Sequence, residues 1–244
     1  MKKYLVLILV MLAVLTLSTG VMAQRYVVGT NASFPPFEYV EDGEIVGFDI
    51  DLVKEIAELQ GFEVEFRDIS FDSLPAGIAS GSLDIVAAGL TITEARKEIY
   101  AFSDPYYSAN QSVLVHQDSE KDLTVLFGDN DIGVQTGTTG DTWVRDKLLA
   151  ADILTGEIRN YDSYVFVIRD LSNENIDAAV LDKPVAETYS KNNPVKLVAE
   201  LITGEEYGIA VGKNNQALLE EINAGLAKVI ENGTMDELIE KYFE

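Results

Sequence analysis

The segment FDIDLVKEIAELQGFEVEF, residues 48–66, decides the fold class of this chain. Apolar side chains recur at helical spacing over residues 48–59, which predicts an amphipathic helix. Gly61 follows as a typical helix stop. Residues 62–66 then alternate between apolar and charged side chains, as a half-buried strand does. A helix followed closely by a strand is the repeating unit of an α/β protein.

The same rhythm continues on both sides of this segment. Residues 26–29 form an apolar run that ends at a Gly, which predicts a strand before the helix. A second short helix is predicted over residues 74–79, and a buried strand over 84–89. The resulting βαβαβ order predicts a mostly parallel sheet covered by helices.

A second unit repeats the alternation later in the chain. Its predicted strands cover residues 131–134, 157–159, 177–181 and 196–198, and its predicted helices cover 138–150, 164–171 and a segment ending near 190. Residues 112–115 and 207–211 read as strands at the points where the chain would cross between the two units. The tail predicts two further helices, over residues 215–230 and 235–242.

These elements predict an α/β protein of two lobes, each a mostly parallel sheet flanked by helices. We expect the first lobe to be discontinuous, with residues 24–109 and the tail 208–244. Residues 110–207 would form the second lobe.

The composition excludes several classes of function. The 244 residues carry 18 Lys and Arg against 41 Asp and Glu, a net charge of -23. Nucleic-acid binding requires clustered basic residues, so a chain this acidic is not expected to hold a phosphate backbone. Because the chain has no Cys, disulfides, thiolate catalysis and Cys-ligated metals are excluded.

The N-terminus has the pattern of an export signal. Lys2 and Lys3 precede an apolar run over residues 5–17, and small residues stand at the end of the segment 21–23. We therefore expect residues 1–23 to be a signal peptide and the protein to be exported to the periplasm or the outer face of the cytoplasmic membrane. The alternative is that the segment is retained as an uncleaved anchor.

Three candidate binding segments follow predicted strands, where ligands bind in open α/β sheets. Arg96 lies just after Thr91 and Thr93, and an Arg there can grip a carboxylate with two parallel hydrogen bonds, or simply pair with a surface acid. The Gly-rich loop at residues 137–140 opens a helix, where backbone amides attract anions, although a plain turn explains it equally. Asp182 can receive an ammonium group or cap the next helix.

Six motifs occur in an order that resembles the polar amino-acid-binding proteins of ABC importers, solute-binding family 3. They are FPPFE (34–38), GFDIDL (47–52), LTITEAR (90–96), FSDPY (102–106), GTTG (137–140) and DAAVLD (177–182). Together they extend across the chain after residue 23. The resemblance implies a two-lobed periplasmic-binding-protein fold of type II.

The resemblance also implies roles for single residues. Arg96 matches the residue that grips the ligand α-carboxylate, helped by Thr91 and by Thr139 with its loop amides. Asp182 matches the acceptor of the α-ammonium, together with the carbonyl of Gly89. Two aromatic residues match those that sandwich the ligand side chain, and four residues match positions that face its distal end: Phe34 and Phe71, and Asn31, Glu38, Gln135 and Leu181.

By the same resemblance, hinge crossings lie near residues 106–110 and 206–210. The ligand, a free L-amino acid, would bridge the lobes and favour a closed form that docks on a membrane permease. This mechanism is capture and delivery by a monomer, without bond chemistry and without a metal or other cofactor.

The sequence leaves the ligand open between arginine or another basic amino acid and glutamine. Relatives that bind basic amino acids often carry Asp at the position of Asn31, and glutamine-binding relatives often carry Lys and His at the positions of Gln135 and Leu181. Glu38 would receive a guanidinium. Two alternative functions are an amino-acid-related dehydratase on the same fold and the ligand-sensing module of a signalling receptor.

Overall fold

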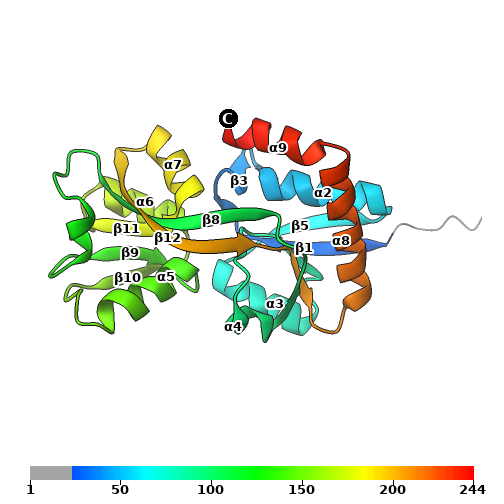
Figure 1. The fold of residues 1–244 in the computed structure, drawn as a ribbon, viewed down its shortest axis with the longest axis horizontal. Helices are drawn as coiled ribbons and strands as arrows, with labels where there is room; N and C mark the ends of the chain where they lie inside the picture. Colours follow the sequence, from blue (N-terminus) through cyan, green and yellow to red (C-terminus); the bar gives the residue numbers. More distant parts are fainter. Residues whose placement is uncertain (1–23) are drawn as a thin grey trace, which may run out of the picture.

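The computed structural model describes residues 24–244 and contains two α/β lobes joined by paired strands (Figure 1). The predicted signal peptide, residues 1–23, lies outside the described residues. The expected fold class, two lobes that each hold a sheet flanked by helices, is confirmed. None of the helices in the described range is long and apolar enough to cross a membrane.

The first lobe is built on a five-stranded sheet. Its strands lie in the order β5 (Glu63–Asp68), β1 (Arg25–Thr30), β6 (Ile85–Val86), β13 (Ala210–Gly212) and β7 (Tyr100–Phe102). The strands β5, β1 and β6 run parallel, and β13 is antiparallel to both of its neighbours. A small antiparallel sheet precedes the first helix, with strands β2 (Ser33–Phe34), β3 (Glu38–Glu41) and β4 (Glu44–Val46).

Helices cover both faces of the first sheet, as Figure 1 shows. On one face pack α2 (Phe48–Gln60), α8 (Gln216–Glu231) and α9 (Thr234–Phe243). On the other face pack η1 (Phe71–Ser73) and α3 (Leu74–Ser80), while α4 (Glu94–Lys97) lies beside β7. The predicted helix over 48–59 is therefore confirmed, and it ends at Gly61 in the left-handed conformation.

The second lobe has the same plan. Its sheet runs β10 (Ile158–Tyr161), β9 (Ile132–Gln135), β11 (Ala178–Asp182), β8 (Tyr107–His116) and β12 (Val195–Tyr207), and its first three strands are parallel. The helices α6 (Tyr164–Ser172) and α7 (Lys183–Asn192) pack on one face. The opposite face is covered by α5 (Thr139–Val144) and a π-helical turn (Arg145–Leu149), and the short η2 (Leu123–Leu126) also packs in that core.

The strands β8 and β12 cross between the lobes as an antiparallel pair (Figure 1). Two predictions here were wrong. The strand predicted over 196–198 is part of the longer strand β12, whereas the strand predicted over 207–211 is divided between the end of β12 at Tyr207 and the separate β13 in the first sheet. The predicted helix over 138–150 is interrupted, since α5 ends at Val144.

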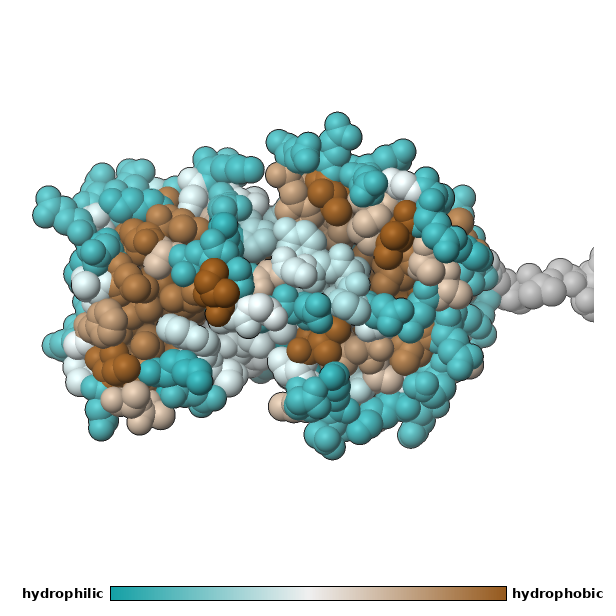
Figure 2. All heavy atoms as spheres, in the orientation of Figure 1, coloured by the Kyte–Doolittle hydropathy of each residue, from teal (hydrophilic) through white to brown (hydrophobic). Residues whose placement is uncertain are grey.

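The space-filling view shows a waist between the lobes, where residues of intermediate hydropathy lie (Figure 2). Hydrophilic residues rim both lobes in this view, and brown residues gather within each lobe. The candidate site lies where the lobes meet.

Candidate functional site

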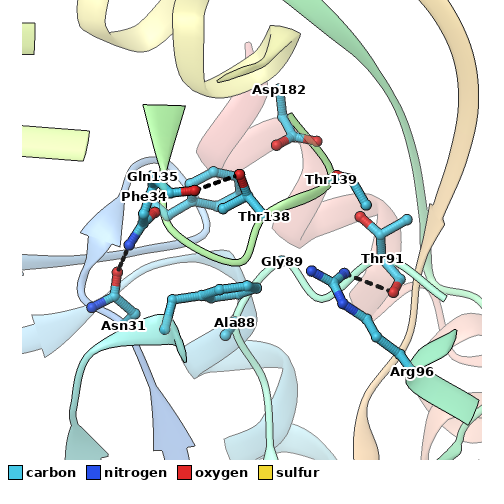
Figure 3. Close-up of a pocket in the computed structure, with 11 residues that line it drawn as sticks. Asn31, Phe34, Ala88, Gly89, Thr91, Arg96, Gln135, Thr138, Thr139 and Asp182 are labelled. Carbon is cyan, nitrogen blue, oxygen red and sulfur yellow. Dashed lines mark hydrogen bonds between the residues drawn. The ribbon is translucent and has the colours of Figure 1, made fainter. Parts of the chain in front are cut away.

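A pocket at the meeting of the two lobes brings most of the predicted site residues together (Figure 3). Its walls come from loops that follow β1, β6, β9 and β11, at the carboxyl ends of parallel strands, where ligands bind in such sheets. The free volume inside it is about 10 Å³, room for about one water molecule. The lining residues are Asn31, Phe34, Phe71, Ala88, Gly89, Thr91, Arg96, Gln135, Thr138, Thr139 and Asp182.

Arg96 lies on α4 and extends its guanidinium toward the second lobe. Its Nη1 donates to the carbonyl of Thr91 at 2.9 Å, and its Nη2 donates to the carbonyl of Gly137 at 3.1 Å. The guanidinium also lies 5.3 Å from the ring centroid of Phe71, within cation–π range. Burial lowers the pKa of Arg96, and the negative charges of Asp182 and Glu205 oppose that effect.

Thr91 and Glu94 have the spacing of a capping box, but the structure does not form one. Thr93 is the N-cap of α4, where its hydroxyl accepts the N–H of Arg96 at 3.1 Å. This leaves the hydroxyl of Thr91 free to reach across the pocket.

Asp182 ends β11 and stands at the N-cap position of α7, but its side chain makes no capping bond. It is 4% exposed, and its Oδ1 accepts a hydrogen bond from Nε2 of Gln111 at 2.9 Å. Burial raises the pKa of Asp182 to about 7, with the charge of Glu205 as the next cause. In Figure 3 its carboxylate and the guanidinium of Arg96 point into the same space from opposite sides. The pocket thus presents the carboxylate of Asp182 and the guanidinium of Arg96 to a ligand.

The hydroxyls of Thr91 and Thr139 approach each other from the two lobes. Both donate to the same oxygen of Glu205, at 2.8 Å from Thr91 and 2.7 Å from Thr139. Within the Gly-rich loop, Thr138 is the N-cap of α5 and accepts the N–H of Asp141. The loop therefore opens a helix as the sequence predicts.

Gly89 lines the pocket in a left-handed backbone conformation, at a position where there is no room for a Cβ. Its φ is +52°, and a Cβ there would lie 2.5 Å from the ring of Phe34. Its N–H donates to the buried carboxylate of Asp49 at 2.9 Å, which also accepts the hydroxyl of Tyr106. Burial raises the pKa of Asp49 to about 6. Asp49 therefore fixes the backbone beside the pocket.

Some of the residues predicted to contact the ligand side chain line the pocket, and others do not. Phe34 and Phe71 both line the pocket, and so do Asn31 and Gln135, which join the lobes by a 2.8 Å hydrogen bond from Nε2 to Oδ1. Glu38 is absent from the lining of this pocket. It is 1% exposed, its carboxylate has no hydrogen-bond partner among the described residues, and burial raises its pKa well above the usual value.

Three residues at or beside the pocket were missed by sequence reasoning. Ala88 lines the pocket next to Gly89, and Thr138, which lies in the candidate loop 137–140 but had no role of its own, lines it too. Gln111 and Glu205 contact the lining side chains from β8 and β12. Leu181, expected at the distal end, is buried and does not line this pocket. Within residues 24–244, no cluster of His, Asp or Glu has the arrangement of a metal site.

Comparison with known proteins gives concordant results. A histidine-binding protein of Neisseria gonorrhoeae, itself named as probable, is 39% identical over 227 residues, which cover 89% of this chain and 82% of that protein. ABC transporter arginine-binding protein 1 of Escherichia coli (strain K12) is 34% identical over 228 residues, 91% of either chain.

Solved structures of an ancestral arginine-binding protein share this fold. The form bound to arginine is 42% identical with a TM-score of 0.85 and covers 91% of this chain and 100% of that one. The form bound to glutamine is 41% identical with a TM-score of 0.84 and covers 91% and 99%. The sequence profile of the bacterial extracellular solute-binding proteins, family 3, matches residues 26–244. The chain therefore belongs to the family 3 bacterial extracellular solute-binding proteins, as the resemblance of its motifs predicted.

Proposed function

We propose that this protein captures a free polar L-amino acid between its lobes and delivers it to the permease of an ABC importer. The observation that carries the proposal is that Arg96 and Asp182 face one small pocket between the lobes. An α-amino acid carries a carboxylate and an ammonium on the same carbon atom, and a guanidinium with a carboxylate complements that pair.

In this proposal Arg96 binds the α-carboxylate, assisted by Thr91 and Thr139. Asp182 and the carbonyl of Gly89 accept the α-ammonium. Support comes from the position of Asp182, because its carboxylate makes no helix cap and is buried beside the pocket. A buried carboxylate with a raised pKa has much to gain from an arriving cation.

The side chain of the ligand would lie between Phe34 and Phe71. At its far end stand the amides of Asn31 and Gln135, which can donate and accept hydrogen bonds. We propose arginine, another basic amino acid, or glutamine as the ligand. The relatives support this range, since one is named for arginine and the ancestral protein was solved with arginine and with glutamine. Glu38 would contribute to the distal end only if the pocket widens.

We further propose that residues 24–109 with 208–244, and residues 110–207, move as the two lobes about β8 and β12. Hydrogen bonds join the lobes across the pocket, from Arg96 to Gly137 and from Gln135 to Asn31, so entry requires the lobes to separate. The protein acts as an exported monomer after removal of residues 1–23, and it returns its ligand chemically unchanged.

A thermal-shift screen of the purified protein against the common L-amino acids tests the proposal. A ligand at 1,000 times its Kd adds about 4 kcal/mol to the free energy of unfolding, which raises the midpoint of a chain of this size by about 8–16 °C. Mass spectrometry of the released ligand should show the intact amino acid. Release of a keto acid would favour the dehydratase alternative, and no shift with any amino acid would refute the proposal.

A further inference from the structure

Glu205 on the hinge strand β12 places a carboxylate at the mouth of the candidate site. It follows a shift in the register between β12 and β8 and is partly buried. Its Oε2 accepts the hydroxyls of Thr91 and Thr139, and its Oε1 accepts Nε2 of Gln111 and the hydroxyl of Thr203, both at 3.0 Å. Four donors therefore converge on this one side chain.

The two hydroxyls come from different lobes. Thr91 follows the first-lobe strand β6, and Thr139 begins the second-lobe helix α5. A single carboxylate oxygen from the hinge thus connects the lobes through groups that also belong to the pocket wall. Because a hydroxyl has only one proton to donate, neither Thr can serve Glu205 and a second carboxylate at once.

Other contacts in the same region are consistent with a closed pocket. Arg96 donates to the carbonyl of Gly137, and Tyr189 donates to the carbonyl of Ser33 across the lobes at 2.8 Å. The pocket's free volume of about 10 Å³ leaves room for about one water molecule. In this arrangement, the carboxylate of Glu205 accepts the hydrogen bonds of the two pocket hydroxyls.

We propose that Glu205 acts as an internal carboxylate that occupies the ligand's hydroxyl donors and holds the unliganded lobes together, so that an incoming amino acid must displace it. This inference rests on the proposed function for the identity of the incoming group. Under this proposal, Glu205 is a hinge residue that lowers the affinity of the site for its ligand. Removal of Glu205 would free Thr91 and Thr139 for the ligand and weaken the closed form without ligand.

The test compares Glu205→Ala with Glu206→Ala in the full chain. Glu206 is the exposed neighbour on the same strand, so its removal changes the net charge equally and leaves the pocket hydroxyls untouched. Small-angle scattering without ligand measures the radius of gyration, and calorimetric titration with L-arginine and L-glutamine measures Kd. We expect Glu205→Ala to expand the unliganded protein and to lower Kd by about tenfold. Glu206→Ala should match the parent in both measurements.

Two outcomes overturn the inference. A radius of gyration equal to that of the parent would show that Glu205 does not hold the lobes. A Kd that is unchanged or higher in Glu205→Ala would show that Glu205 does not compete with the ligand. If no amino acid binds the parent, the proposed function fails, and the scattering comparison alone decides whether Glu205 holds the lobes.

Discussion

Replacing Asp182 with Asn separates a ligand-binding role from a structural one, because the two predicted effects have opposite signs. Burial raises the pKa of Asp182 from 3.8 to about 7. The folded protein therefore retains this proton at pH values where the unfolded chain has released it. Stability from the neutral carboxyl is fully present below about pH 4 and is lost as the pH rises through about 7.

The magnitude follows from the displaced pKa. Ionisation of Asp182 in the folded state costs about 4 kcal/mol above pH 7, and about 2–3 kcal/mol of this appears between pH 5 and pH 8. An Asn at this position never ionises. The stability of Asp182→Asn relative to the parent should thus increase by about 2–3 kcal/mol over that interval, which corresponds to about 4–12 °C in the unfolding midpoint.

Binding should change in the other direction. Without the carboxylate, the ligand's ammonium is left buried and unpaired, which costs about 3–5 kcal/mol and raises Kd by about two to three and a half orders of magnitude. Scanning calorimetry without ligand at pH 5 and pH 8, and titration calorimetry at pH 8, measure both effects. Binding within about threefold of the parent would show that Asp182 does not pair with the ligand's ammonium, and lower stability than the parent at pH 8 would show that burial does not penalise the charge of Asp182.

Asp177→Asn is the matched control. Asp177 stands just before the same strand and pairs with Lys121 at 2.6 Å, where hydrogen bonding to Lys121 keeps its pKa below the usual value despite partial burial. Its ionised form is stabilised by folding, so the Asn variant should lose stability at pH 8. Its affinity for the amino acid should equal that of the parent.

Three further predictions follow from the same site. Arg96→Ala should raise Kd by about two to three and a half orders of magnitude, whereas Arg67→Ala, an exposed control, should not, as measured by titration calorimetry. The affinity of the parent should be about tenfold weaker at pH 6 than at pH 8, since the ammonium needs ionised Asp182, and Asp182→Asn should abolish this dependence. Gly89→Ala should cost about 1–3 kcal/mol more in urea unfolding than Gly43→Ala, because both have positive φ but only Gly89 faces an aromatic ring where its Cβ would stand.

Periodicity predicted most of the first lobe. The helix expected over 48–59 is Phe48–Gln60, and the helix expected over 74–79 is Leu74–Ser80. In both helices the apolar periodicity marks the extent of the helix, and the Gly that follows marks its C-terminal end. The small sheet of β2, β3 and β4 was not predicted, since two Pro residues and short runs read as a loop. Long-range pairing decides such segments, and it leaves little trace in local sequence.

The same limit explains what was missed at the site. Asp182 ends a strand, the Gly-rich loop follows one, and Arg96 lies on the first helix after β6, so their convergence could be predicted from topology. Glu205 stands after a register shift in β12, in a segment that lies between the two strands predicted from sequence. Only the pairing of β12 with β8 directs this side chain toward the pocket, and the same holds for Gln111.

The most direct test of the account is a calorimetric titration with L-arginine and L-glutamine beside the corresponding amines that lack the α-carboxylate. We predict that an amino acid binds with one site per chain and that its amine binds at least about 100-fold more weakly, since Arg96 then has no carboxylate to hold. Equal affinity for the amino acid and its amine would contradict the account.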